Sequence, residues 1–253
     1  MTPPEPAEPH PPVRSPVRAV LFDAGNTLLF LEYGRLAEGV AAVCGIPLTG
    51  ADLARCAPAA AQALERGHGP DQERASAYLE RLFRLAGVPA DCWPEVRTTL
   101  YAMHAERHLW SGVDPRTGDA LARLRRRGLL LGVVSNSDGR VEAALAAAGL
   151  RDCFDVVIDS RLAGVEKPEP RIFHLALDVL GVAPHDALYV GDVYEIDVVG
   201  ARRAGMAAAL VDPAGLHAAR DVPSAPSVGT LMDRLETLGL LPRNRPSAEI
   251  ARP

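Results

Sequence analysis

The chain has 253 residues, 48% of them hydrophobic, which is enough to bury one large core or two unequal ones. Its formal net charge is −5, so the composition excludes the strongly basic surface with which proteins bind nucleic acid or an anionic membrane. Four widely spaced cysteines without a Cys-x-x-Cys pair, and the absence of a bilayer-length apolar run, favour a reduced cytoplasmic protein without structural zinc. We therefore expect a small-molecule partner, whereas the oligomeric state is not determined by the sequence.

The two ends of the chain are predicted to be disordered tails. Residues 1–16 carry seven prolines and few apolar side chains, so they cannot bury enough surface to offset their ordering entropy. Residues 242–253 have a similar composition. The folded part of the chain should lie between these tails.

Short apolar runs with the composition of strands buried on both faces recur along the chain. They are VRAVLF before Asp23, LLLGVVS ending at Ser135, FDVVID ending at Asp159, ALYV before Gly191 and AAALV ending at Val211. Between the later runs, residues 117–127, 139–149, 169–181 and 195–205 show the apolar spacing of helices. This alternation of strands and helices predicts an α/β fold with a parallel sheet.

The stretch from Glu32 to Gly112 interrupts the alternation. It contains no convincing strand, but residues 34–45, 52–67, 73–87 and 94–110 have helical patterns. We expect residues 32–112 to form an inserted all-helical domain, and residues 17–31 and 113–241 to form the sheet domain.

Polar residues follow the predicted strands, at the edge where open parallel sheets bind ligands. Asp23 follows the first strand in LFDAGNTLL, where its carboxylate can attack phosphorus, although an aspartate that caps a loop fits the same position. Asn26 suits the turn that follows because asparagine tolerates positive φ. Ser135 and Asn136 follow the second strand, where a hydroxyl and backbone N–H groups can hold phosphoryl oxygens, with a helix N-cap as the alternative.

Lys167 and two further aspartates extend this set. Lys167, in GVEKPEP, can offset the charge of a phosphoryl group, although a solvated loop lysine is the simpler interpretation of that segment alone. Asp192 and Asp197 follow the fourth predicted strand, and carboxylates that approach Asp23 repel it unless a cation lies among them. Mg²⁺ prefers oxygen ligands, so the pattern predicts a magnesium site, with partners of a helix dipole as the alternative.

In this order and combination, the motifs resemble those of the haloacid dehalogenase-like hydrolase superfamily, over about Val17 to Leu240. The resemblance implies a Rossmann-like core with a helical cap inserted after the first strand, in agreement with the expected insert. It also implies a Mg²⁺-dependent phosphatase that acts on a small phosphorylated metabolite through an aspartyl-phosphate.

The resemblance assigns roles to individual residues. Asp23 is expected to be the nucleophile, Lys167 the charge-stabilising amine and Ser135 the phosphate-binding hydroxyl. The expected metal ligands are Asp23, Asp192, Asp197 and the main-chain carbonyl of Gly25. We further expect substrate contacts from Asn26, Thr27 and Asn136.

Gly25 departs from the pattern of the superfamily. Its phosphatases usually read Asp-x-Asp-Gly-Thr, and the second Asp, which acts as general acid and base, is replaced here by Gly25. General acid–base catalysis contributes about 10²–10⁴-fold, so turnover is expected to be slow or confined to good leaving groups. One alternative is a weakly active or inactive relative that binds a phosphorylated ligand or a protein. A 2-haloacid dehalogenase is less favoured because the metal-binding motif is intact, and a Schiff-base mechanism is disfavoured because residues 32–112 contain no lysine.

Side chains near the end of the insert are expected to influence substrate choice. His104, Arg107, His108 and Trp110 lie close to its return to the sheet domain. Arg107 or a histidine here could contact substrate or replace the missing acid, although a polar helix face is the simpler explanation.

Overall fold

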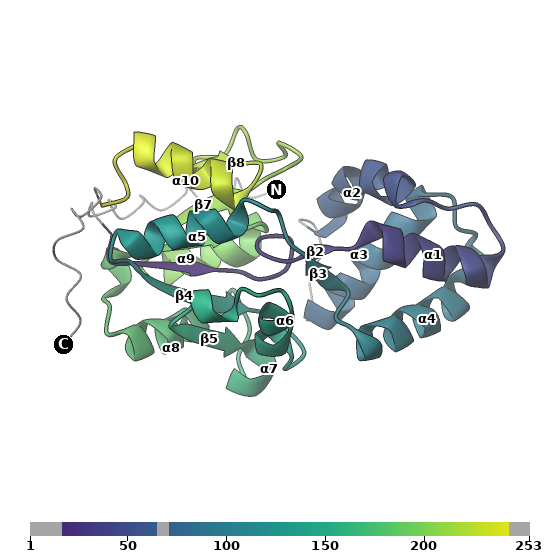
Figure 1. The fold of residues 1–253 in the computed structure, drawn as a ribbon, viewed down its shortest axis with the longest axis horizontal. Helices are drawn as coiled ribbons and strands as arrows, with labels where there is room; N and C mark the ends of the chain where they lie inside the picture. The colour runs from purple at the N-terminus through teal and green to yellow at the C-terminus, as the bar shows by residue number, and fades with distance from the viewer. Residues whose placement is uncertain (1–16, 65–70, 243–253) are drawn as a thin grey trace, which may run out of the picture.

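The computed structural model describes residues 17–64 and 71–242, which form a sheet part and a helical part (Figure 1). The predicted tails, residues 1–16 and 242–253, lie outside the described residues except for Pro242. Within the described ranges, no helix combines the length and apolar character needed to cross a membrane. The cytoplasmic location stays a prediction.

A six-stranded parallel sheet forms the larger part, in the order β5-β4-β1-β6-β7-β8. The strands are β1 (Ala19–Phe22), β4 (Leu130–Ser135), β5 (Val156–Asp159), β6 (Ala187–Gly191), β7 (Ala207–Val211) and β8 (Ser224–Ala225). The first five coincide with the predicted apolar runs, so the predicted α/β fold with a parallel sheet is confirmed. The chain runs outward from β1 on both sides, first through β4 and β5 and later through β6, β7 and β8.

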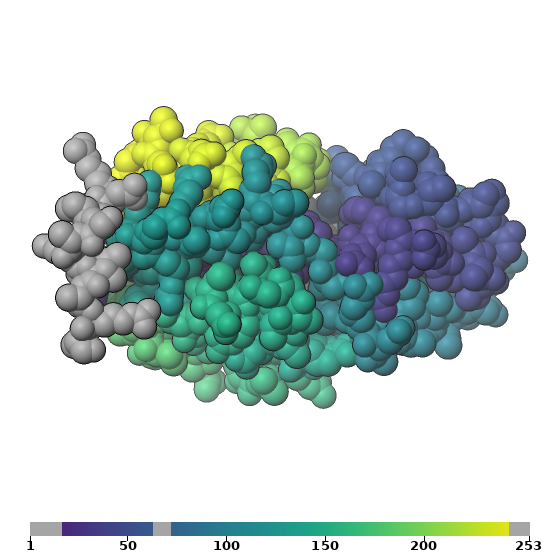
Figure 2. All heavy atoms as spheres, viewed as in Figure 1, coloured from purple at the N-terminus to yellow at the C-terminus, as the bar shows by residue number. Residues whose placement is uncertain are grey.

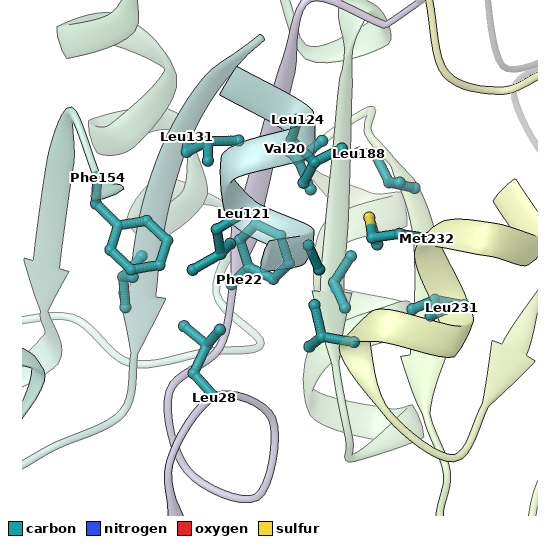
Figure 3. Packing of buried hydrophobic residues seen from close by; sticks show 14 of the residues in the cluster. Val20, Phe22, Leu28, Leu121, Leu124, Leu131, Phe154, Leu188, Leu231 and Met232 are labelled. Atoms are coloured by element: carbon teal, nitrogen blue, oxygen red, sulfur yellow. The ribbon is translucent and has the colours of Figure 1, made fainter. Parts of the chain in front are cut away.

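Side chains of the central strand alternate between two buried clusters. Val20 and Phe22 pack on one face with Leu121 and Leu231 (Figure 3), and Leu21 packs on the other. The first face is covered by α5 (Thr117–Arg126), α6 (Val141–Ala147) and α10 (Val228–Thr237), and the second by α8 (Pro170–Leu180) and α9 (Val199–Arg203). Since both faces are buried, the strands read as continuous apolar runs.

Local signals set the ends of several helices. α8 begins with Pro170, whose fixed φ suits a first helical turn, and ends at Gly181 in the left-handed region. α10 begins with a capping box between Ser227 and Thr230. The shorter helices are α7 (Ser160–Ala163), η1 (Ala90–Cys92), η2 (Arg151–Cys153), η3 (Pro184–Asp186) and η4 (Tyr194–Val198).

Within residues 32–64 and 71–112, four α-helices form the smaller part around a hydrophobic cluster of their own. They are α1 (Tyr33–Cys44), α2 (Gly50–Leu64), α3 (Asp71–Leu85) and α4 (Trp93–Glu106), and the cluster includes Leu36, Leu82 and Phe83. Figure 2 shows these residues as a purple and blue lobe beside the teal, green and yellow sheet part. The exact domain boundaries at residues 32 and 112 stay a prediction.

Two short strands join the parts. β2 (Phe30–Leu31) pairs antiparallel with β3 (Trp110–Gly112), so the expectation of no strand between Glu32 and Gly112 is wrong at its last three residues. Strands of two or three residues are too short to show a period of two, and their pairing depends on residues far apart in sequence.

Replacing Leu121 tests the packing of α5 on the sheet. Leu121 is fully buried, so Leu121→Ala should lower the free energy of unfolding by about 2–5 kcal/mol through lost burial and the cavity left behind. Leu162 is 76% exposed, and Leu162→Ala should change it by less than about 0.5 kcal/mol. Urea unfolding followed by circular dichroism measures both, and equal effects would contradict the described packing.

Candidate functional site

Loops from three adjacent strands meet at the carboxyl edge of the sheet. Asp23 follows β1, Ser135 ends β4 and Asp192 follows β6, and both β4 and β6 pair with β1. Strand order diverges at β1, and a crevice at such a point is where open α/β sheets bind ligands. Lys167, in the loop between α7 and α8, reaches into the same place.

The ammonium group of Lys167 lies at the centre of this cluster. Its Nζ donates to Asp23 Oδ1 at 2.7 Å, to Asp197 Oδ1 at 2.7 Å and to the Tyr189 hydroxyl at 2.9 Å. Lys167 is 4% exposed and is the only lysine in the chain. Burial opposes its charge, but the carboxylates of Asp197 and Asp23 raise the pKa of Lys167 well above its ordinary value, so the ammonium stays charged.

Asn136 fixes the backbone of the lysine loop. Its Oδ1 accepts from the Lys167 N–H at 2.8 Å, and its Nδ2 donates to the Lys167 carbonyl at 3.1 Å. This reciprocal pair ties the loop after β4 to a segment 31 residues away. Asn136 therefore positions Lys167, and its predicted contact with substrate stays a prediction.

Tyr189 is a site residue that the sequence analysis missed. Its hydroxyl donates to the Val134 carbonyl at 2.7 Å and accepts from Lys167, so it aligns the ammonium from the floor of the site. The available signal was a tyrosine within an apolar strand, because a buried phenol requires a hydrogen-bond partner.

Asp23 is held by two side-chain donors. Its Oδ1 accepts from Lys167 and from the Ser135 hydroxyl, the latter at 3.0 Å, and its side chain is almost fully enclosed. Burial raises the pKa of Asp23 from 3.8 to about 6, against the lowering effect of Lys167. The predicted grouping of Asp23, Ser135 and Lys167 is thus realised in space.

Asp23, Asp192 and Asp197 each offer a carboxylate oxygen, and these oxygens lie within 4.8 Å of one another. Asp197 Oδ2 accepts from the backbone N–H groups of Asp192 and Val193, at 3.0 and 2.9 Å, so Asp197 also shapes the loop that carries Asp192. A Cβ at Gly191 would collide with the Asp197 carboxyl, which explains the glycine at the end of β6.

The charge of this cluster fits a divalent cation. Its three carboxylates against one ammonium leave two negative charges unbalanced. Burial and the neighbouring carboxylates of Asp197 and Asp23 raise the pKa of Asp192 well above its ordinary value. A hard cation with oxygen ligands, such as Mg²⁺, would relieve this repulsion.

A cavity of about 550 Å³ extends from this cluster to the helical part. Tyr78 of α3 and Tyr101 of α4 line it on the helical side, together with Trp110 of β3. The Trp110 indole donates to Asn26 Oδ1 at 3.0 Å, and Asn26 has φ 53°, as expected for its turn. The cavity therefore connects the acidic cluster with aromatic walls.

Two residues expected to bind substrate do not line this cavity. Thr27 is fully buried, and its hydroxyl has no hydrogen-bond partner among the described residues. Arg107 forms an ion pair with Glu32 at 2.6 Å. Their substrate contacts stay predictions, whereas His104 and His108 do line the cavity.

Comparisons with known proteins agree with the fold and the motifs. The sequence model of a family described as haloacid dehalogenase-like hydrolase matches residues 17–205. Phosphatase MT3486 of Mycobacterium tuberculosis is 30% identical over 231 residues, which are 86% of this chain and 97% of that protein. Haloacid dehalogenase-like hydrolase domain-containing protein 3 of Bos taurus is 36% identical over 167 residues. The aligned region is 63% of this chain and only 66% of that relative's length. The solved HAD phosphatase from Thermococcus onnurineus superposes with a TM-score of 0.56 at 26% identity, covering 89% of this chain and all of that one.

The raised pKa of Asp23 makes stability depend on pH when divalent cations are removed. The folded-state pKa of about 6 lies above the ordinary value of 3.8, so this stabilising contribution is fully present below pH 3.8 and is lost as the pH rises through 6. In EDTA, the wild type should lose stability between about pH 4 and about pH 7, whereas Asp23→Asn lacks this titrating carboxyl. The unfolding free energy of Asp23→Asn minus that of the wild type should therefore rise by roughly 1–3 kcal/mol over this range. Urea unfolding across this range measures the shift.

Asp178→Asn serves as the control because Asp178 is exposed on α8. That variant should keep the pH dependence of the wild type. Parallel curves for the wild type and Asp23→Asn would show that Asp23 does not titrate with a raised pKa.

Proposed function

The chain belongs to the haloacid dehalogenase-like hydrolases, and we propose that it is a Mg²⁺-dependent phosphatase of small phosphorylated metabolites. The observation that carries this proposal is the buried set of Asp23, Lys167 and Ser135 beside two further carboxylates at the end of a cavity. The relative that aligns over nearly its whole length is named a phosphatase, which supports the same reaction class.

Asp23 is suited to act as the nucleophile. One of its carboxylate oxygens would form a bond to phosphorus while the bond from phosphorus to the leaving oxygen breaks and its electron pair departs with that oxygen. Water would then attack the phosphorus of the aspartyl-phosphate, releasing inorganic phosphate and restoring the carboxylate. Lys167 and Ser135 orient Asp23 before the attack because both donate to it.

Lys167 and Ser135 would also act on the phosphoryl group, Ser135 as the hydroxyl that binds it and Lys167 through its charge. The ammonium offsets negative charge that develops on the phosphoryl oxygens, and it does so from a buried position where solvent screens it little. Because Tyr189 and Asn136 fix the lysine from two sides, little reorganisation is required during the reaction.

Asp23, Asp192 and the Gly25 carbonyl would hold Mg²⁺, with Asp197 supporting the loop of Asp192. Bound there, the ion would supply positive charge that neutralises phosphoryl oxygens and screens the carboxylates from one another.

Phosphatase activity is tested with p-nitrophenyl phosphate. Phosphate release should require Mg²⁺, disappear in EDTA, and fall by at least about 10³-fold in Asp23→Asn, since the amide cannot form the covalent intermediate. Asp178→Asn should retain wild-type turnover. An Asp23→Asn variant as active as the wild type would contradict the assignment of the nucleophile.

A second candidate function rests on Gly25, which removes the usual acid–base carboxylate. A protein without turnover could still bind a phosphorylated ligand or a partner protein through the same site. Dehalogenation of a 2-haloacid is less favoured because of the acidic cluster, and halide release tests it directly.

The binding alternative predicts stabilisation without hydrolysis. With Mg²⁺ present, inorganic phosphate at about 100 times its Kd should stabilise the folded protein by about 2.7 kcal/mol. Thermal unfolding measures the shift, and phosphate-release assays over a panel of phosphorylated metabolites measure turnover. Turnover of any of them would remove the case for a pure binding protein.

A further inference from the structure

Position 25 has space for a side chain. Among the residues that the structure describes, and apart from its chain neighbours, a Cβ at Gly25 would meet only the Trp110 indole within 4 Å, at 3.8 Å from Cδ1 and from Nε1. Gly25 is not among the residues with positive φ, so its backbone conformation does not require glycine. The site therefore lacks a carboxyl group at this position although the fold can accommodate one.

His104 cannot take over as proton donor, because its proton is already engaged. The Leu109 N–H donates to His104 Nδ1 at 3.2 Å, so Nδ1 is unprotonated and the proton lies on Nε2. That proton is donated to Asp138 Oδ2 at 2.9 Å. Although burial opposes it, hydrogen bonds from His104 and Arg140 lower the pKa of Asp138 to about 2, so Asp138 has no proton to give.

His108 is also unsuited to be the acid. Its Nδ1 lies 3.1 Å from the Trp110 carbonyl, an acceptor, so the ring proton lies on that nitrogen. Burial and the neighbouring His104 lower the pKa of His108, which keeps the ring neutral. The Trp110 N–H is engaged by Asn26.

Lys167 commits all three of its protons to Asp23, Asp197 and Tyr189. Among the described residues that line the cavity, Glu166 is a further carboxyl group outside the acidic cluster, and it lies on the exposed rim. The hydroxyl-bearing Tyr78 and Tyr101 also line the cavity, so Glu166 and these two tyrosines are the residues that an experiment has to examine separately.

The walls of the cavity indicate the kind of leaving group. Tyr78, Trp93, Tyr101 and Trp110 present aromatic surface. Among the described residues, α3 contributes Arg74 to the cavity and α4 contributes Arg97. Both are positively charged. Such a wall suits an apolar ring and an oxygen that departs as an anion.

Resting on the proposed phosphatase function, we propose that the site selects phosphates whose leaving oxygen is weakly basic, namely aryl or acyl phosphates with an apolar body, over alkyl phosphates. The Asp23 carboxylate forms the new bond to phosphorus, and the bond to the leaving oxygen breaks. Its electron pair leaves with the oxygen as an aryloxide or a carboxylate, which requires no proton from the protein. An alkoxide is too basic to leave in this way.

The dependence of kcat/KM on the leaving group tests this proposal. We expect wild-type kcat/KM to fall steeply from p-nitrophenyl phosphate through phenyl phosphate to the alkyl ester phosphoserine, by at least about 10²-fold overall. Gly25→Asp should raise kcat/KM for phosphoserine by about 10²–10⁴-fold and for p-nitrophenyl phosphate by less than about tenfold, because it restores the acid. Gly25→Asn, of similar size, should leave the dependence steep. Benzoyl phosphate run beside phenyl phosphate separates acyl from aryl leaving groups.

Several results would overturn the proposal. Equal wild-type kcat/KM for aryl and alkyl phosphates would refute the selection while leaving the phosphatase function standing. A steeper dependence in Glu166→Gln, His108→Gln, Tyr78→Phe or Tyr101→Phe would reveal an acid already present and would also refute it. Absence of turnover with p-nitrophenyl phosphate would refute the proposed function itself.

Discussion

The site depends on the hydrogen bonds that the buried ammonium of Lys167 donates. It joins segments up to 144 residues apart, because Asp23, Asp197 and Tyr189 each accept one of its protons. Removing the ammonium would leave buried carboxylates uncompensated, and an uncompensated buried charge typically costs about 3–5 kcal/mol. The other basic side chains of the chain, histidines aside, are all arginines, and a planar guanidinium could not direct three protons to acceptors placed around a compact ammonium. The charge, size and geometry of one side chain therefore hold three loops in register.

The same constraint creates an excess of negative charge. Drawing Asp23 and Asp197 to the ammonium also brings Asp192 close, since Asp197 accepts from the backbone of the loop that carries it. One ammonium cannot balance three carboxylates, so the electrostatics favour a divalent cation. With that cation bound, the negative charge would be balanced and an anionic phosphoryl group could lie against Lys167. The repulsion among the carboxylates and the proposed binding of the cation therefore both result from the gathering of three aspartates around Lys167.

The helical part and the sheet part contribute different chemistry to the cavity. Strand ends supply the charged groups that would act on phosphorus in the proposed reaction. The helices supply aromatic, aliphatic and arginine side chains that could contact the remainder of a substrate. Trp110 links the two because β3 returns the chain to the sheet part and its indole donates to Asn26, beside Gly25. In the proposed reaction, position 25 would set which leaving groups can depart, and the cavity walls would set which substrate bodies fit.

Structural features that depend on consecutive residues, such as strands and turns, could be predicted from the sequence alone. The five principal strands were predictable because burial on both faces produces continuous apolar runs, and the location of Asp23, Ser135 and Asp192 followed from where those runs end. The turn at Asn26 was likewise predictable from the tolerance of asparagine for positive φ. Resemblance to a family supplied the expected roles, which local patterns do not contain.

Only the tertiary structure decided which groups meet through space. The side-chain amide of Asn136 donates one hydrogen bond to the Lys167 backbone and accepts one from it. Tyr189 proved to be a partner of Lys167, and Arg107 was found paired with Glu32. The short strands β2 and β3 appeared for the same reason, since each is defined by its distant partner. Hydrogen bonds and ion pairs between residues far apart depend on distances set by the whole fold, and no local pattern of residues encodes those distances.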